Sequence, residues 1–203
     1  MILKFLDYAG AYVLRNAAYY FFPKHVLQLS DAIAHLEAQA DHIPQDSDLD
    51  VLIRALVAGE DRRFLVHYGV DSKGLARAAI LLLTRKKLQG ASTITQQLVR
   101  VLTNDYRYSL YRKFKEMCLA CVVDRAVSKR TQAVLYIRIA YFGWQMNGVA
   151  QAWMRLQMAT PLSSSAAALL IARLRYPEPR QTTAEYLERL NRRGRYIAAL
   201  IIQ

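Results

Sequence analysis

Residues 110–127 read LYRKFKEMCLACVVDRAV, and this stretch, with residues 129–141 (KRTQAVLYIRIAY) after it, decides the expected fold. Apolar side chains recur every three or four positions in both stretches, which predicts two helices. The same spacing, with capping residues and basic ends, predicts helices at about 25–40, 48–59, 71–87, 92–102, 148–158, 163–175 and 183–202. Eight glycines and five prolines in 203 residues are too few for an all-β sandwich. The sequence therefore predicts an all-α protein.

Composition narrows the class of protein and of partner. A chain of 203 residues with 54% hydrophobic residues can bury a core, which excludes a disordered tail. The net charge of +12 implies an anionic partner, which could be nucleic acid, acidic lipid or a phosphorylated substrate. Cys118 and Cys121 lie three residues apart in a helical pattern, so we interpret them as small apolar side chains rather than zinc ligands or a disulfide.

The N-terminal residues 1–24, MILKFLDYAGAYVLRNAAYYFFPK, are amphipathic. Charged residues interrupt them, so they are neither a spanning helix nor a conventional signal peptide. Aromatic rings beside cations suit a helix in a membrane interface, and a helix that packs on the domain is an equal alternative. We expect residues 1–45 to form this segment, membrane-interfacial or packed, and residues 46–203 to form the main domain.

Three strings carry residues suited to chemistry. In the first, Glu60 and Asp61 follow an apolar helix, where a partly desolvated carboxylate can act as a general base, although an isolated acidic pair more often forms ion pairs. In the second, residues 90–100 (GASTITQQLVR), a glycine turn leads into a helix start that suits an anion. Gln96 and Gln97 carry amides that suit sugar hydroxyls and N-acetyl groups.

The third string, residues 112–116 (RKFKE), places Arg112 and Lys113 on one helix face with Glu116. An ion pair on a helix surface is the simpler interpretation. A carboxylate in a cationic setting that faces a pyrophosphate is the functional one.

Together, EDRRFLVHYGVD (60–71), GASTITQQLVR (90–100), RKFKE (112–116) and SKRTQAVLYIRIAYFG (128–143) resemble the motifs of the peptidoglycan glycosyltransferases, the transglycosylase family that polymerises lipid II. The similarity is clear from about Val51 to Ala152. No transpeptidase domain is visible after it, so the sequence resembles a divergent, monofunctional member. The resemblance implies an all-α, lysozyme-like head lobe with a smaller, membrane-facing jaw lobe.

The resemblance also implies roles for single residues. Glu60 matches the catalytic base, and Glu116 matches a second glutamate that assists departure of undecaprenyl pyrophosphate, directly or through a divalent cation (Mg or Mn) that is not obligatory. Arg100, Arg112 and Lys113 match phosphate contacts. The further residues expected to bind substrate are Asp61, Phe64, His67, Gly90, Ser92, Thr93, Gln96, Gln97 and Lys129. We expect His67 to order its loop through a hydrogen bond.

Several positions depart from the family pattern. Val134 and Arg138 stand where members usually have glutamate and asparagine, and no transmembrane anchor is seen. Both glutamates are present, which favours an active enzyme over an impaired homologue that binds lipid-linked sugars or a partner synthase without turnover. A nucleic-acid binder lacks any supporting motif, and a lysozyme-type hydrolase is a further alternative because fold does not fix the reaction.

The resemblance implies the partners and the place of action. We expect lipid II, the growing glycan strand and the membrane surface as partners, a cell-wall synthase as a further candidate partner, and no nucleic acid. Family members act at the outer face of the cytoplasmic membrane, and this location is expected here by resemblance, although no export signal is visible.

Overall fold

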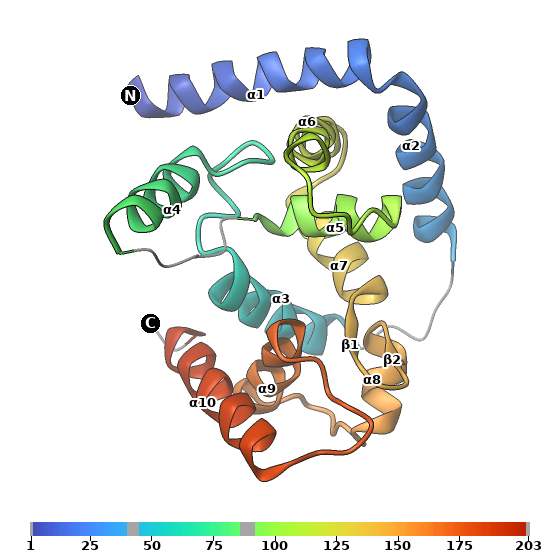
Figure 1. Ribbon diagram of the computed structural model, residues 1–203. Helices are drawn as coiled ribbons and strands as arrows, with labels where there is room; N and C mark the ends of the chain where they lie inside the picture. Colours follow the sequence, from blue (N-terminus) through green and yellow to red (C-terminus); the bar gives the residue numbers. More distant parts are fainter. Residues whose placement is uncertain (1, 40–44, 86–91, 202–203) are drawn as a thin grey trace. The chain divides into compact units, whose positions relative to one another are not determined.

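The computed structural model of the protein describes residues 2–39, 45–85 and 92–201 (Figure 1). Over these ranges the chain forms ten helices and one antiparallel pair of strands, so the predicted all-α class is confirmed. The elements are α1 (Ile2–Phe21), α2 (Pro23–Ala38), α3 (Asp46–Glu60), α4 (Ser72–Arg85), α5 (Ile94–Thr103), α6 (Leu110–Ala126), α7 (Lys129–Ile139), β1 (Tyr141–Gly143), β2 (Met146–Asn147), α8 (Val149–Arg155), α9 (Ser164–Arg175) and α10 (Ala184–Ile201).

The chain divides into two compact units, each made of two separate segments. The first unit combines Met1–Leu36 with Arg63–Gln132, and the second combines Glu37–Arg62 with Ala133–Gln203. The expected boundary at residues 45 and 46 is a division by function, which this division by packing does not test. A distinct membrane-interfacial role for residues 1–45 stays a prediction.

In the first unit, α1 and α5 both pack against α6. Ala18 of α1, Leu98 of α5 and Leu119 of α6 are fully buried, because each helix turns its apolar face toward this core. Cys118 and Cys121 lie in the same core as free thiols, and burial raises their pKa values to about 11 and about 12. They are neutral, buried side chains, as the sequence predicts.

A glycine brings the loop after α3 onto α6. Gly69 has φ +85°, and a Cβ atom there would lie 2.5 Å from the carbonyl oxygen of Ala120. Only glycine accommodates both the left-handed backbone and this close approach. The loop that carries His67 and Asp71 is thereby held against the central helix of the first unit.

In the second unit, α3, α9 and α10 pack together around Leu56, Ile171 and Ile197, all fully buried. The hairpin is joined to the loop before α10 by two backbone hydrogen bonds. The amide of Trp144 donates to the carbonyl of Glu178 (2.7 Å), and the amide of Glu178 donates to the carbonyl of Phe142 (3.0 Å). The loop with Pro177 and Pro179 is thus fixed to the hairpin by backbone hydrogen bonds.

Helix boundaries agree with the predictions to within a few residues, with two informative differences. The helix expected from about residue 48 begins two residues earlier, because α3 starts at Asp46. Asp48, in the first turn of α3, accepts a hydrogen bond from the amide of Leu162 (2.7 Å). The helix expected to reach residue 141 ends at Ile139, because the backbone turns into the β1–β2 hairpin, where Gly143 has φ +136°.

The N-terminal helix is amphipathic, as predicted. Ala18 is buried, whereas Tyr12, Val13 and Tyr20 are 53, 65 and 79% exposed. Across the described ranges, no helix combines the length and the apolar character needed to cross a bilayer. The α1 helix therefore contributes to the core through one face and exposes the rings of Tyr12 and Tyr20 on the other, and exposed apolar surface of this kind is typical of an interaction site.

Candidate active site

Glu60 is the last residue of α3, in the second unit. Its side chain is 16% exposed, and its Oε1 lies 3.3 Å from Nη2 of Arg193 in α10. The same Nη2 donates to the carbonyl of Gly59. Asp61 follows as the C-cap of α3 and is buried (7% exposed), with its amide donating to Val57. The two acidic residues are therefore held at a helix end rather than on an open helix face.

Arg193 was not among the residues predicted to form a site. It lies 133 positions from Glu60, so only the fold brings the two together. The Cζ atom of Arg193 also lies 5.4 Å from the ring centre of Tyr196, and the Cζ atom of Arg62 lies 5.6 Å from the same ring centre. The one available signal was the basic segment LERLNRR, in which Arg193 is the last residue.

Glu116 is the centre of the cluster in the first unit. It is 3% exposed, and each carboxylate oxygen accepts two hydrogen bonds. Arg100 donates from Nε (2.9 Å) and Nη2 (3.1 Å), Arg112 from Nη1 (2.5 Å) and Lys113 from Nζ (2.8 Å). The bonds to Arg112 and Lys113 are within α6, as the spacing predicts. Arg100 comes from α5, and the burial of Glu116 excludes a simple ion pair on a helix surface.

Ser92 joins this cluster through its hydroxyl. Its Oγ accepts from Nζ of Lys113 (2.9 Å) and from Nη2 of Arg100 (3.3 Å). Burial lowers the pKa of Lys113, with the cations Arg100 and Arg112 acting in the same direction and Glu116 opposing them. Three cations around one carboxylate leave a local charge of +2, and a site of this charge favours a second anion.

Thr93 and Gln96 form the start of α5. The Thr93 side chain accepts from the amide of Gln96 (3.2 Å), and the Gln96 side chain accepts from the amide of Thr93 (3.0 Å), which is a capping box. The Thr93 hydroxyl also donates to the carbonyl of Gly69 (2.6 Å). Both side chains are buried, so their described contacts are structural. Sugar recognition by Thr93, Gln96 and Gln97 stays a prediction.

A second group of motif residues gathers elsewhere in the first unit. The rings of Phe64 and His67 meet edge to face at 6.1 Å, and Nζ of Lys129 lies 4.6 Å from the Phe64 ring centre. Lys129 also pairs with Asp124. His67 is 1% exposed, and the loop-ordering hydrogen bond expected of it stays a prediction. Gly90, the other expected site residue of the second string, lies outside the described residues.

The donor set at Glu116 does not fit a divalent cation. Both carboxylate oxygens already accept from cations, and a metal ion would add charge to a cluster that is already positive. Among the described residues, no group of three or more His, Cys, Asp or Glu side chains could hold a metal ion. A role for Glu116 as a metal ligand stays a prediction without support from this geometry.

The described chain thus combines an all-α fold with one glutamate at a helix end and a second glutamate that contacts three cations. The chain belongs to the transglycosylase family, because the family model described as "Transglycosylase" matches residues 32–201.

Relatives of known name match a smaller part of the chain. Penicillin-binding protein 1A of Rickettsia felis is 40% identical over 116 residues, which is 54% of this chain and 14% of that protein. The proteins of the same name from Escherichia coli and Neisseria gonorrhoeae are both 39% identical, over 113 and 104 residues, or 55 and 51% of this chain and 13% of each relative. The matched region thus spans about one seventh of the length of these relatives.

Proposed function

We propose that the protein is a peptidoglycan glycosyltransferase that polymerises lipid II into β-1,4-linked glycan strands. Membership of the transglycosylase family supports this function. The observation that carries it within the chain is the Glu116 cluster, which holds Arg100, Arg112 and Lys113 together at a net positive site. A lipid-linked pyrophosphate donor requires cations of this kind.

In the proposed reaction, the Glu60 carboxylate accepts the proton of the acceptor sugar's 4-hydroxyl. The hydroxyl oxygen then forms a bond to the anomeric carbon of the donor. The bond from that carbon to the pyrophosphate oxygen breaks, and its electron pair leaves with undecaprenyl pyrophosphate. An α-linked donor and a β-linked product need only this single inversion, so no covalent sugar–enzyme intermediate forms.

The cations would stabilise the leaving group. Charge that develops on the pyrophosphate as the bond breaks is best stabilised by donors already fixed in place. Glu116 fixes them, since it accepts hydrogen bonds from all three cations. Arg193 would position the Glu60 carboxylate, because its Nη2 lies 3.3 Å from Oε1 of Glu60.

Membrane association is part of this proposal, because lipid II carries a polyprenyl chain. The exposed rings of Tyr12, Tyr19 and Tyr20 on α1 suit the interfacial region of a bilayer. Action at the outer face of the cytoplasmic membrane, and contact with a partner cell-wall synthase, are extensions of the same proposal.

The alternative of an impaired homologue rests on the departures at Val134 and Arg138. Arg138 donates to the carbonyl of Gln39 (3.0 Å) within the second unit. This hydrogen bond gives Arg138 a structural role, so its presence in place of asparagine is weak support for an impaired homologue. Incubation with labelled lipid II in detergent, with Mg²⁺ or with EDTA, separates the two functions. Glycan chains longer than the donor are expected, whereas binding of lipid II without product at any enzyme concentration would establish the impaired homologue.

A further inference from the structure

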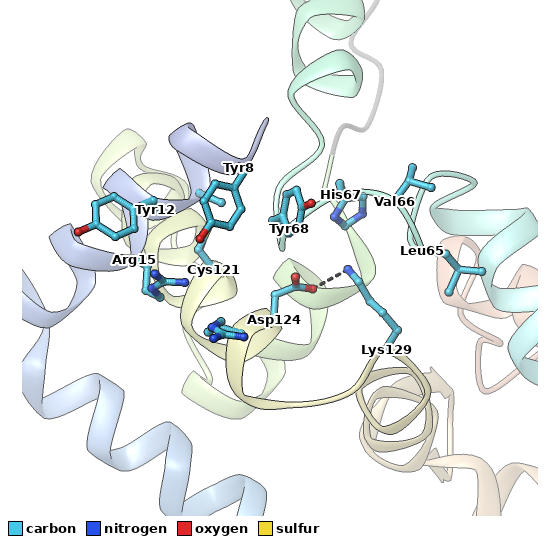
Figure 2. A pocket seen from close by; sticks show the side chains of 12 residues that line it. Tyr8, Tyr12, Arg15, Leu65, Val66, His67, Tyr68, Cys121, Asp124 and Lys129 are labelled. Carbon is cyan, nitrogen blue, oxygen red and sulfur yellow. Dashed lines mark hydrogen bonds and ion pairs between the residues drawn. The ribbon is translucent and has the colours of Figure 1, made fainter. Parts of the chain in front are cut away.

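A cavity of about 470 Å³ lies in the first unit, apart from the Glu116 cluster (Figure 2). It opens between α1, the loop 65–68 and the C-terminal part of α6, and Lys129 closes it from the start of α7. Ser92, Arg100, Arg112, Lys113 and Glu116 do not line it. Its volume is in the range of about 300–1,000 Å³ found for small-molecule sites.

The cavity carries excess positive charge. Arg15, Arg125 and Lys129 line it together with one carboxylate, Asp124. Asp124 accepts from Nζ of Lys129 at 2.5 Å, so these two charges offset each other. Within the described part of the chain, Arg15 and Arg125 have no ion pair, which leaves the cavity with a charge of +2. The Cys121 thiol, also in the lining, adds no charge because burial raises its pKa to about 12.

Aromatic and aliphatic side chains surround these cations. Tyr8 and Tyr12 come from α1 and Tyr68 from the loop, and the rings of Tyr8 and Tyr68 meet edge to face at 5.5 Å (Figure 2). Leu65 and Val66 line the same cavity while 70 and 49% exposed. The cavity therefore joins cations and hydroxyl groups to an exposed apolar rim, and an amphiphilic anion has both of these chemistries.

We propose that this cavity binds the phosphate headgroup of an anionic phospholipid. Arg15 and Arg125 pair with the phosphate, the tyrosine hydroxyls donate to its oxygens or to the headgroup, and the first part of an acyl chain lies over Leu65 and Val66. The site would fix α1 and the motif loop to the bilayer surface. It rests on the membrane association proposed above but not on the transglycosylase reaction.

Calorimetric titration with a short-chain lipid tests the site without a bilayer. Dihexanoyl phosphatidylglycerol, kept below its micellar concentration, should bind the wild-type protein saturably at one site. R15Q/R125Q should weaken this binding at least tenfold. The matched control, K24Q/K73Q, removes two exposed cations of the same unit outside the cavity and should stay within twofold of wild type. Circular dichroism verifies that each variant is folded.

Glycerol 3-phosphate separates a lipid headgroup from a soluble phosphate. It should bind at least tenfold more weakly than the short-chain lipid, and L65S/V66S should narrow this gap. The proposal is overturned by absence of saturable lipid binding, by equal losses in the two charge variants, or by glycerol 3-phosphate that binds as tightly as the lipid. Sedimentation with phosphatidylglycerol vesicles measures membrane association separately from lipid binding in the cavity. E60Q should bind the short-chain lipid like wild type, so failure of the proposed transglycosylase reaction can be told apart from failure of the lipid site.

Discussion

Substitution of Glu116 by glutamine tests how the cationic cluster is held together. The change keeps the shape of the side chain but removes the negative charge that Arg100, Arg112 and Lys113 share. Loss of one partner from a fully buried ion pair costs about 3–5 kcal/mol. Here the three cations are 27, 14 and 26% exposed and keep part of their hydration, so we expect a loss of about 1–3 kcal/mol in the free energy of unfolding.

For a chain of this size, each kcal/mol lowers the unfolding midpoint by about 2–4 °C, so a loss near 2 kcal/mol corresponds to about 4–8 °C. Thermal unfolding followed by circular dichroism measures it. Added pyrophosphate should raise the midpoint more in E116Q than in wild type, because the local charge increases from +2 to +3.

Asp105 provides the matched control. It accepts from Lys115 (2.8 Å) and Arg107 (2.9 Å) in the same unit, and its side chain is 9% exposed. D105N should also lose stability, but its response to pyrophosphate should equal that of wild type, and it should still form glycan. An E116Q protein with an unchanged midpoint and no added response to pyrophosphate would refute the electrostatic account of the cluster.

Three further predictions concern stability. Hydrogen bonds from Arg107 and Lys115 hold the pKa of Asp105 well below its usual range. The Asp105 carboxylate therefore stabilises the fold above its unfolded pKa of about 3.9, and this stability is lost as pH falls toward the folded pKa. When unfolding is measured as a function of pH, D105N should lose less of its free energy of unfolding below pH 4 than wild type. Thr93→Ala removes the capping box and should cost about 1–2 kcal/mol in chemical denaturation, with a cost near zero contradicting the cap. Gly69→Ala places a Cβ atom 2.5 Å from the Ala120 carbonyl and should lower the thermal midpoint more than Gly10→Ala, whose added Cβ meets nothing within 4 Å.

Local features of the fold followed from the sequence. The periodicity of residues 110–127 predicted α6 to within a residue, because the helix is long and its apolar residues from Cys118 to Val123 are buried in the core. The hairpin at 141–147 was missed, since strands of three and two residues carry no alternating pattern and depend on contacts with Glu178.

In the candidate site too, local contacts could be predicted from the sequence and contacts between distant residues could not. Arg112 and Lys113 were correctly paired with Glu116, because a helix fixes the neighbours of each residue at three and four positions. Arg193 was not paired with Glu60, because no local rule relates residues 133 positions apart. The capping role of Thr93 and Gln96 could have been recognised, because a threonine followed three residues later by a glutamine is the pattern of a capping box. The same pattern also occurs on polar helix surfaces.

The most direct test of the proposed function is the rate of glycan formation from labelled lipid II by E60Q. E185Q is the control, since Glu185 is 77% exposed and, among the described residues, pairs only with Arg189 of the same helix (3.7 Å). Loss of the general base should lower the rate by about 10²–10⁴-fold in E60Q while the protein stays folded. E185Q should retain the wild-type rate. A folded E60Q protein that polymerises lipid II within threefold of wild type would contradict the assignment of Glu60 as the base.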